Sequence, residues 1–293
     1  MKLVLLMAPV SIWAQNAISP FTQENNALES PARIGLNGAF AVHHRTTSYN
    51  YVLSPTLANL GGVEYYNEDW QLGMAAGYSS LRLYSEMQIS RFISIARRQT
   101  FGAFDAGIAL SYSRGHVLAS ELSKATYNKN QLVGSVNLVY KGFALDVTND
   151  IIGNSTYELA NEPFQSSVRL AYHKDWGESS IEPAIGYYQH YNFKRLQAQL
   201  ASTYKNRLIW GVGFTYNQPF SNQALLILGY RGQMGEIKLG TSATVSRFRT
   251  TATMISHDLT ICFYHFLHHK RKSFFLQVIH STNNSHTSCN AHL

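Results

Sequence analysis

Large apolar residues alternate with small or polar residues along most of the chain, between residues 36 and 266. In segment 208–216, Leu208, Trp210 and Val212 fall on one face, while Gly211 and Gly213 fall on the other. This period of two matches a β-strand, in which successive side chains point to opposite faces, and does not fit a helix. The same alternation recurs in segments 106–112, 136–140, 143–147, 168–172, 185–191 and 237–245. The pattern predicts an all-β protein of antiparallel strands.

No apolar run reaches the roughly 18 residues that a membrane-spanning helix needs, and the longest uncharged apolar stretch covers residues 3–14. Only 14% of the residues are charged, against about 25% in ordinary soluble domains. Much of the surface is therefore expected to face lipid. A closed barrel satisfies every backbone amide inside a bilayer. We predict an antiparallel transmembrane β-barrel over residues 36–266, with about 12–14 strands and fourteen favoured.

Aromatic residues crowd the predicted strand ends. Tyr65, Tyr66 and Trp70 surround the polar residues 67–69, and Trp176 follows Lys174 and Asp175 closely. Amphipathic rings of this kind are typical of the headgroup level of a bilayer. A soluble β-sandwich is the structural alternative, since one wet face also produces period-two alternation. Segments such as 241–244 lack charge on both faces, which favours the barrel.

The two ends of the chain differ from its middle. Lys2, the apolar residues that follow it and the small residue Ala14 are typical of a signal peptide over residues 1–14, cleaved before Gln15. Residues 15–35 are then expected to form a periplasmic segment ahead of the barrel. Residues 267–293 form a polar and basic tail that no barrel of this type needs, and we expect it to be a disordered extension.

The formal net charge of +7 comes from scattered basic residues, with a single cluster at residues 270–272. Because they form no stripe, no nucleic-acid partner is expected. Cys262, in a predicted strand, and Cys289, in the tail, make no disulfide framework and are not interpreted as catalytic. The adjacent His268 and His269 cannot both face one ion from a regular element, and the tail fits no zinc spacing.

Motifs of enzymatic chemistry are missing from the sequence. It contains neither G-x-S-x-G nor H-E-x-x-H, and no phosphate-binding loop. Ser256 and His257 are neighbours on a predicted strand, so their side chains point to opposite faces and cannot pair. Isolated histidines are interpreted as lumen or turn residues: His43, His44, His116, His173 and His190. Some carboxylates are interpreted as solvated loop groups: Glu64, Glu68, Asp69, Asp146 and Asp150. We predict a non-enzymatic protein without catalytic, metal-binding or cofactor-binding residues.

Both ends of the predicted mature protein resemble one family. Residues 19–35 contain Pro20 and Phe21 and then Pro31, Ala32 and Gly35 in a motif of the Asn-Pro-Ala-x-x-Gly kind, with serine in place of asparagine. The final predicted strand contains His257 and Asp258 and would close at Phe266. These features resemble the PorP/SprF family, outer-membrane proteins of the type IX secretion system of Bacteroidetes. Phe266 departs from the family pattern, because it alternates with Cys262 instead of with the apolar Phe263.

The resemblance implies a barrel in the cell outer membrane that supports secretion or surface anchoring of cargo such as gliding adhesins. Its implied partners are components of the secretion machinery, the secreted cargo protein and the outer-membrane lipid. Pro31 and Gly35 would mark the start of the first strand, where proline has no amide to pair and glycine accepts unusual dihedrals. Two other functions stay open: an outer-membrane channel or transporter for small or hydrophobic solutes, and a secreted β-sandwich acting as a binding module.

Overall fold

The computed structural model describes residues 30–36, 39–50, 55–83, 86–118, 126–155, 166–190, 193–218, 221–246 and 253–265. The signal peptide with its cleavage site between Ala14 and Gln15, residues 15–29, Phe266 and the tail 267–293 lie outside these residues. The described chain is almost entirely strand, preceded by the short 3-10 helix η1 (Pro31–Arg33). Within the described ranges, no helix is long and apolar enough to cross a membrane.

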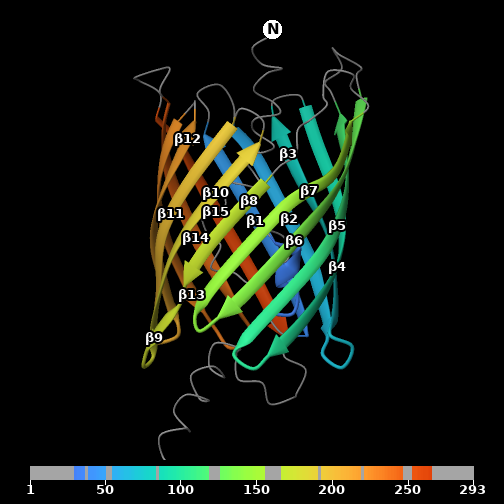
Figure 1. Ribbon diagram of the computed structural model, residues 1–293. Helices are drawn as coiled ribbons and strands as arrows, with labels where there is room; N and C mark the ends of the chain where they lie inside the picture. Colours follow the sequence, from blue (N-terminus) through green and yellow to red (C-terminus); the bar gives the residue numbers. More distant parts are fainter. Residues whose placement is uncertain are drawn as a thin grey trace, which may run out of the picture.

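The strands form one closed antiparallel barrel (Figure 1). In chain order they are β1 (Phe40–Asn50), β2 (Pro55–Asn67), β3 (Leu72–Leu83), β4 (Glu86–Phe101), β5 (Phe104–Leu118), β6 (Thr126–Tyr140), β7 (Phe143–Ser155), β8 (Ser166–Tyr172), β9 (Lys174–Trp176), β10 (Ser179–His190), β11 (Phe193–Tyr204), β12 (Leu208–Gln218), β13 (Ser221–Arg231), β14 (Gly235–Ser246) and β15 (Thr253–His265).

Pairing between β1 and β15 closes the ring. Strands β8 and β9 are separated only by His173 and both pair with β10. Together they occupy one place in the wall, so the fifteen strands make a barrel of fourteen. This confirms the predicted antiparallel barrel with the favoured strand number, and excludes the two packed sheets of a β-sandwich.

The two faces of each strand meet different surroundings. On β12, Ile209 is 2% exposed and faces the lumen, whereas Trp210 is 41% exposed and faces outward. Outward positions on other strands are likewise large and apolar, for example Ile95, Ile108 and Leu239. A transmembrane barrel needs this apolar outer band. In the alternation seen in the sequence, the large apolar positions therefore face lipid, and the positions between them face the lumen.

The two ends of the barrel have connections of different length. From β2–β3 to β13–β14, the connections at one end span two to four residues. At the other end, four connections also span two to four residues, but seven residues separate β5 from β6, ten separate β7 from β8 and six separate β14 from β15. Lys141 and Gly142 both have positive φ, as a two-residue hairpin turn of type I′ requires. Outer-membrane barrels place short turns in the periplasm and long loops outside, so the start of β1 and the end of β15 are periplasmic.

Exposed aromatic residues gather at the short-turn end, as the sequence predicts. They include Tyr65, Trp70, Phe101, Phe104, Tyr140, Phe143, Trp176 and Tyr204. Lysine ammonium groups lie over three of these rings, at 5.2 Å for Lys141 over Tyr140, 5.0 Å for Lys174 over Trp176 and 5.5 Å for Lys205 over Tyr204. Tyr66 departs from the expectation, because it is buried on the lumen side.

Charge is distributed unequally between the two faces of the wall. The sequence suggested that both faces were poor in charge, but this is wrong for the lumen face. Asp105, Asp146, Asp150, Glu236 and Lys238 are all buried inside the barrel. The expectation that Glu64, Asp146 and Asp150 are solvated loop groups is also wrong, since each belongs to a strand and is buried. The shortage of charge belongs to the outer face.

Candidate functional site in the barrel lumen

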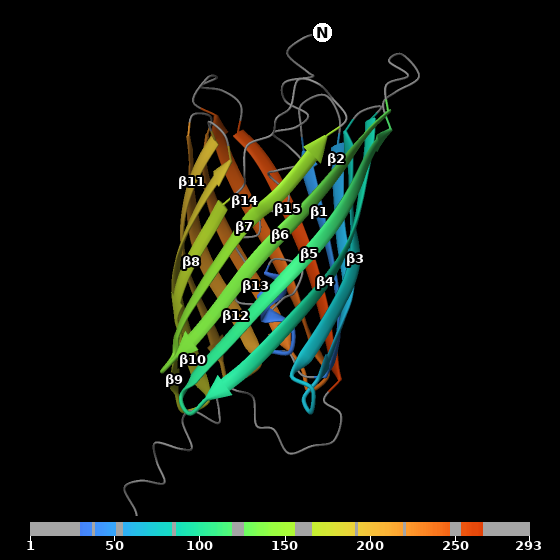
Figure 2. The ribbon, with the colours of Figure 1, turned by 45° about the vertical axis from the view of Figure 1, so that its right-hand side comes forward.

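Residues 30–36, called here the lumen segment, fold as a compact turn inside the ring of strands (Figure 2). The Arg33 N–H donates to the Ser30 carbonyl at 2.9 Å and the Ile34 N–H donates to the Pro31 carbonyl at 3.2 Å. Pro31 takes the first helical position, where a missing N–H costs little. The side chains of Ala32 and Ile34 are fully buried. Residues 30–35 of the segment expected to be periplasmic therefore lie within the barrel.

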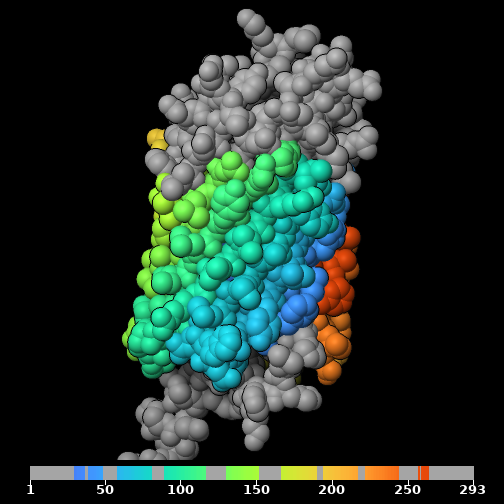
Figure 3. All heavy atoms as spheres, turned by 90° about the vertical axis from the view of Figure 1, so that its right-hand side faces the viewer, coloured from blue at the N-terminus to red at the C-terminus, as the bar shows by residue number. Residues whose placement is uncertain are grey.

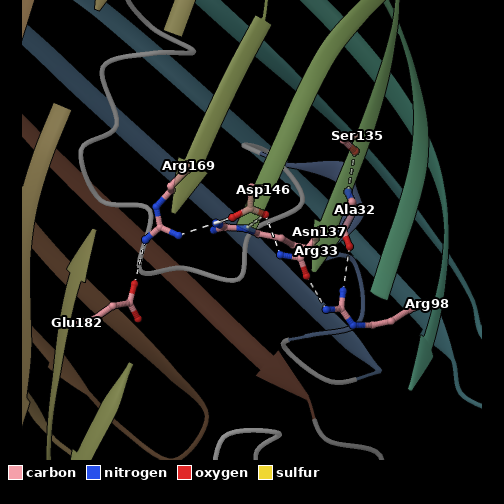
Figure 4. A network of polar contacts seen from close by, with 8 residues as sticks. All are labelled: Ala32, Arg33, Arg98, Ser135, Asn137, Asp146, Arg169 and Glu182. Carbon is pink, nitrogen blue, oxygen red and sulfur yellow. Dashed lines mark hydrogen bonds and ion pairs between the residues drawn. The ribbon is translucent and has the colours of Figure 1, made fainter. Parts of the chain in front are cut away.

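The backbone of the lumen segment is bound to the wall on two sides (Figure 4). The Ala32 N–H donates to Ser135 Oγ on β6 at 3.0 Å. The Ala32 carbonyl accepts a hydrogen bond of 2.9 Å from Arg98 Nη1 on β4. Both backbone polar groups of the fully buried Ala32 are thus satisfied by side chains that face the lumen, which removes the cost of burying them.

Arg33 fixes the lumen segment through a buried ion pair. Its guanidinium contacts both carboxylate oxygens of Asp146 on β7, with the Nε–Oδ1 bond at 2.8 Å. Asn137 donates to the same Asp146 Oδ1 at 2.8 Å and accepts from Arg98 Nη2 at 2.6 Å. Arg98 in turn pairs with Asp105, Nε to Oδ2, at 2.9 Å. The residues form one connected network in which buried charges face opposite charges, as burial demands.

The network continues along the wall to β8 and β10. Arg169 Nη1 lies 3.7 Å from Asp146 Oδ2, and Arg169 Nη2 donates to Glu182 Oε1 at 2.9 Å. His173 Nδ1 lies 3.5 Å from Glu182 Oε2, and His173 Nε2 lies 2.9 Å from Asp175 Oδ1. Asp146 is therefore shared between an arginine of the lumen segment and an arginine of the wall.

Glycines let the lumen segment approach the wall closely. A side chain at Gly73 would collide with Ile34 Cγ2, and one at Gly107 would collide with the Ala32 carbonyl oxygen. Gly35 has φ +93°, and a Cβ there would lie 2.7 Å from the Tyr66 ring. The positive φ and the close ring both favour glycine at position 35.

A second polar cluster crosses the seam between the first and last strands. His43 Nδ1 lies 2.9 Å from Cys262 Sγ, and His43 Nε2 lies 3.5 Å from Glu64 Oε1. Cys262 lies on β15, as the sequence predicts for a strand residue, and is not in a disulfide. All three side chains are almost completely buried. The cluster is therefore a buried contact between β15, β1 and β2, and not an accessible nucleophile.

The structure places the residues that carried the family resemblance in different parts of the barrel. Pro31, Ala32 and Gly35 come together in the lumen segment, although they do not mark the start of β1. His257 faces outward beside Thr241, with 3.2 Å between Nδ1 and Oγ1. Asp258 belongs to β15, opposite Thr47 and Gly240. Phe263, which is 59% exposed, is the outward aromatic near the end of β15.

The sequence did not identify the wall residues that hold the lumen segment: Arg98, Ser135, Asn137, Asp146 and Arg169. A usable signal was present for one of them. Asp146 lies between Leu145 and Val147, on the face opposite to their predicted lipid face. Strand alternation alone therefore places Asp146 in the lumen.

No protein-family profile and no curated protein matches the chain. Its fold is similar to solved outer-membrane barrels. The CymD monoaromatic hydrocarbon channel has a TM-score of 0.59 at 8% identity, covering 87% of this chain and 94% of its own. The Ralstonia pickettii toluene transporter TbuX has a TM-score of 0.54 at 11% identity, covering 81% and 93%. The Pseudomonas putida toluene transporter TodX has a TM-score of 0.53 at 10% identity, also covering 81% and 93%.

The structural similarity establishes the fold, but sequence identities this low leave the activity open. The chain is an outer-membrane β-barrel, with an apolar outer band and a charged lumen near the short-turn end. The resemblance to the PorP/SprF family rests on its sequence motifs alone.

Proposed function

We propose that this chain is a non-enzymatic outer-membrane channel for small hydrophobic solutes. The observation that carries the proposal is the lumen segment itself, a folded piece of chain docked inside a barrel of fourteen strands and held by polar contacts. Such a segment narrows the barrel near the periplasmic end without adding a catalytic group. The lumen then becomes a passage whose width depends on the placement of the segment.

The distribution of side chains in the lumen supports a hydrophobic solute. The lumen segment packs against β4, β5 and β6. About half-way round the ring, β12 and β13 present Ile209, Leu225 and Ile227 to the lumen. One side of the interior is therefore occupied by the anchored segment, and the other has an apolar patch bordered by the polar residues Thr215 and Gln223 of the same strands. An apolar wall with a few convergent polar groups is typical of sites for small molecules.

The similar structures give support at the level of fold. CymD is described as a monoaromatic hydrocarbon channel, and TbuX and TodX as toluene transporters. This chain spans more than nine-tenths of each of their lengths. A barrel of the same architecture with an apolar patch in its lumen wall is suited to the same class of solute.

Uptake of radiolabelled toluene by cells that carry the barrel in their outer membrane tests the proposal. We expect faster uptake than in host cells without the barrel. The double variant Leu225→Asn, Ile227→Asn should reduce it, because it replaces the apolar lumen wall with amides. Gln223→Asn is the matched control, since Gln223 also faces the lumen from β13. Uptake no faster than in the host alone would overturn the proposal, provided that the barrel shows the heat-dependent gel shift of a folded barrel.

A role as an accessory of type IX secretion is the second candidate. It is supported by the motif residues Pro31, Ala32 and Gly35, which form one ordered unit in the lumen segment. Cross-linking in native membranes, followed by purification of the barrel, should recover secretion components and a secreted cargo protein if this role holds. Deletion should then abolish surface display of the cargo and leave toluene uptake unchanged. The opposite pair of results would favour the channel.

A further inference from the structure

Two arginines stand side by side on the outer face of the barrel. Arg91 on β4 is directly opposite Arg114 on β5, and both side chains are exposed. Neither makes a hydrogen bond or an ion pair with a residue that the structure describes. Residues opposite each other on neighbouring strands have Cβ atoms about 5 Å apart, and like charges in such a pair are destabilising. The pair therefore calls for a negatively charged partner.

The carboxylates of the wall whose side chains the structure describes do not supply that partner. Asp105, Asp146, Asp150, Glu182 and Glu236 are among the acidic side chains that point inward, away from the outer face. Among the strand residues whose exposure is described, no acidic side chain faces outward. The charge that meets Arg91 and Arg114 must come from outside the described wall.

The height of the two arginines is set by the strands that carry them. Arg91 is ten residues from Phe101, at the short-turn end of β4, and Arg114 is ten residues from Phe104 on β5. At about 3.3 Å per residue and a tilt of about 40°, ten residues rise about 25 Å along the barrel axis. This equals the height of the apolar band of an outer-membrane barrel, about 25 Å.

On β5, the outward residues between these two levels are Ala106, Ile108, Leu110 and Tyr112. On β4, the apolar Ile93 and Ile95 lie next to Arg91, and the polar Arg97 and Gln99 follow only toward the short-turn end. This side of the barrel, formed by β2 to β6, faces the viewer in Figure 3. Because the short turns are periplasmic, Arg91 and Arg114 lie at the headgroup level of the outer leaflet, immediately above the hydrocarbon.

Further donors extend the row on both sides of the arginine pair. Tyr78 on β3 is opposite Arg91, and Asn130 on β6 is opposite Arg114. Tyr112 Oη donates to Asn130 Oδ1 at 3.0 Å, so the amide nitrogen of Asn130 is turned away from that bond. His116 is exposed two residues beyond Arg114. The row combines two guanidinium groups with neutral donors. A guanidinium group can donate two parallel hydrogen bonds to two oxygens of one phosphate.

We propose that Arg91 and Arg114 form a binding site for the phosphate group of a phosphorylated lipid of the outer leaflet, whose acyl chains lie over Ile93 and Tyr112. A lipid fits better than a free anion, because the pair borders the apolar band and a lipid supplies both the phosphate and the hydrocarbon. The site is independent of what passes through the lumen.

Binding of radiolabelled lipid A to the full-length barrel in non-ionic detergent tests this proposal. We expect the double variant Arg91→Gln, Arg114→Gln to bind at least about tenfold more weakly, since two charge-assisted contacts are lost. Arg97→Gln is the matched control, because Arg97 is an exposed outward arginine on β4, opposite the first residue of β3 at the short-turn end. It should bind lipid A as the unmodified barrel does, and each variant must show the gel shift of a folded barrel.

Dephosphorylated lipid A separates the headgroup from the acyl chains, and inorganic phosphate separates a lipid from a free anion. We expect the dephosphorylated lipid to bind the unmodified barrel as weakly as lipid A binds the double variant, and millimolar inorganic phosphate to leave lipid A binding unchanged. Equal binding of the two lipids, full competition by inorganic phosphate, or an equal loss in Arg97→Gln would each overturn the proposal.

Discussion

A single methyl group at position 107 should release the lumen segment from the wall. Gly107 lies on β5 with its α-carbon beneath the Ala32 carbonyl, and a Cβ there would collide with that oxygen and lie 2.9 Å from Arg98 Nη1. Gly107→Ala therefore pushes apart the two groups that form the Arg98–Ala32 hydrogen bond. The barrel wall can keep its pairing, because β5 accepts alanine at neighbouring lumen positions such as Ala109.

The size of the effect follows from the bonds that are lost. The Ala32 N–H bond to Ser135 is a neutral hydrogen bond, which contributes about 1 kcal/mol, and the Arg98 bond to the Ala32 carbonyl is charge-assisted and contributes about 2 kcal/mol. Together they amount to about 3 kcal/mol, or roughly a hundredfold change in the population of the released segment. The Arg33–Asp146 pair can only add to this figure.

Hydrogen exchange of the amides in residues 30–36 measures that population directly, because local opening controls the exchange of buried amides. We expect exchange in Gly107→Ala to be about a hundredfold faster than in the unmodified barrel. Gly186→Ala is the matched control, since Gly186 faces the lumen from β10 and the nearest atom to its added Cβ is 3.8 Å away. Unchanged protection in Gly107→Ala, or equal acceleration in Gly186→Ala, would refute the reasoning.

Three further outcomes are expected. Asp146→Asn removes the carboxylate shared by Arg33 and Arg169 and should lower the free energy of unfolding in urea by about 3–5 kcal/mol; an unchanged midpoint would contradict the network. Val212→Arg places a charge near the middle of the outward face of β12 and should cost about 2–4 kcal/mol in folding into vesicles, whereas Leu208→Arg at the end of the strand should cost about 0–1; equal costs would argue against the assigned membrane level. In a Cys289→Ser background, maleimide should label Cys262, which is 1% exposed, only after thermal unfolding, and rapid labelling of the folded barrel would contradict its burial.

The strands and their lipid faces were predictable because alternation is a local property. Leu208, Trp210 and Val212 carry the signal within five residues, and no distant contact is needed to interpret it. The closing of the ring is different, because His43 meets Cys262 across 219 positions of sequence. The pairing of β1 with β15 is predicted only by the general rule that a sheet in a membrane cannot leave the backbone groups of an edge strand unpaired.

The lumen segment was recognisable as a motif but its placement was not. Pro31 and Gly35 suit both the start of a strand and a tight turn, so local geometry leaves both options open. The deciding residues, Gly73 and Gly107, stand within strands, where a glycine can equally mark a bulge or a tight bend. Their role depends on which strand surface the segment meets, and that contact joins residues too far apart in the chain for a local pattern to predict it.

The sharing of Asp146 affects how firmly the lumen segment is held. A buried ion pair is costly to break mainly because it leaves one charge without a partner. If Arg33 leaves, Asp146 keeps Asn137 as a donor at 2.8 Å and Arg169 at 3.7 Å. Arg33 itself would move towards water, where its charge is solvated. Release of the segment therefore costs less than the rupture of an isolated buried pair, so the network can hold a segment in place and still allow it to move when the proposed channel conducts.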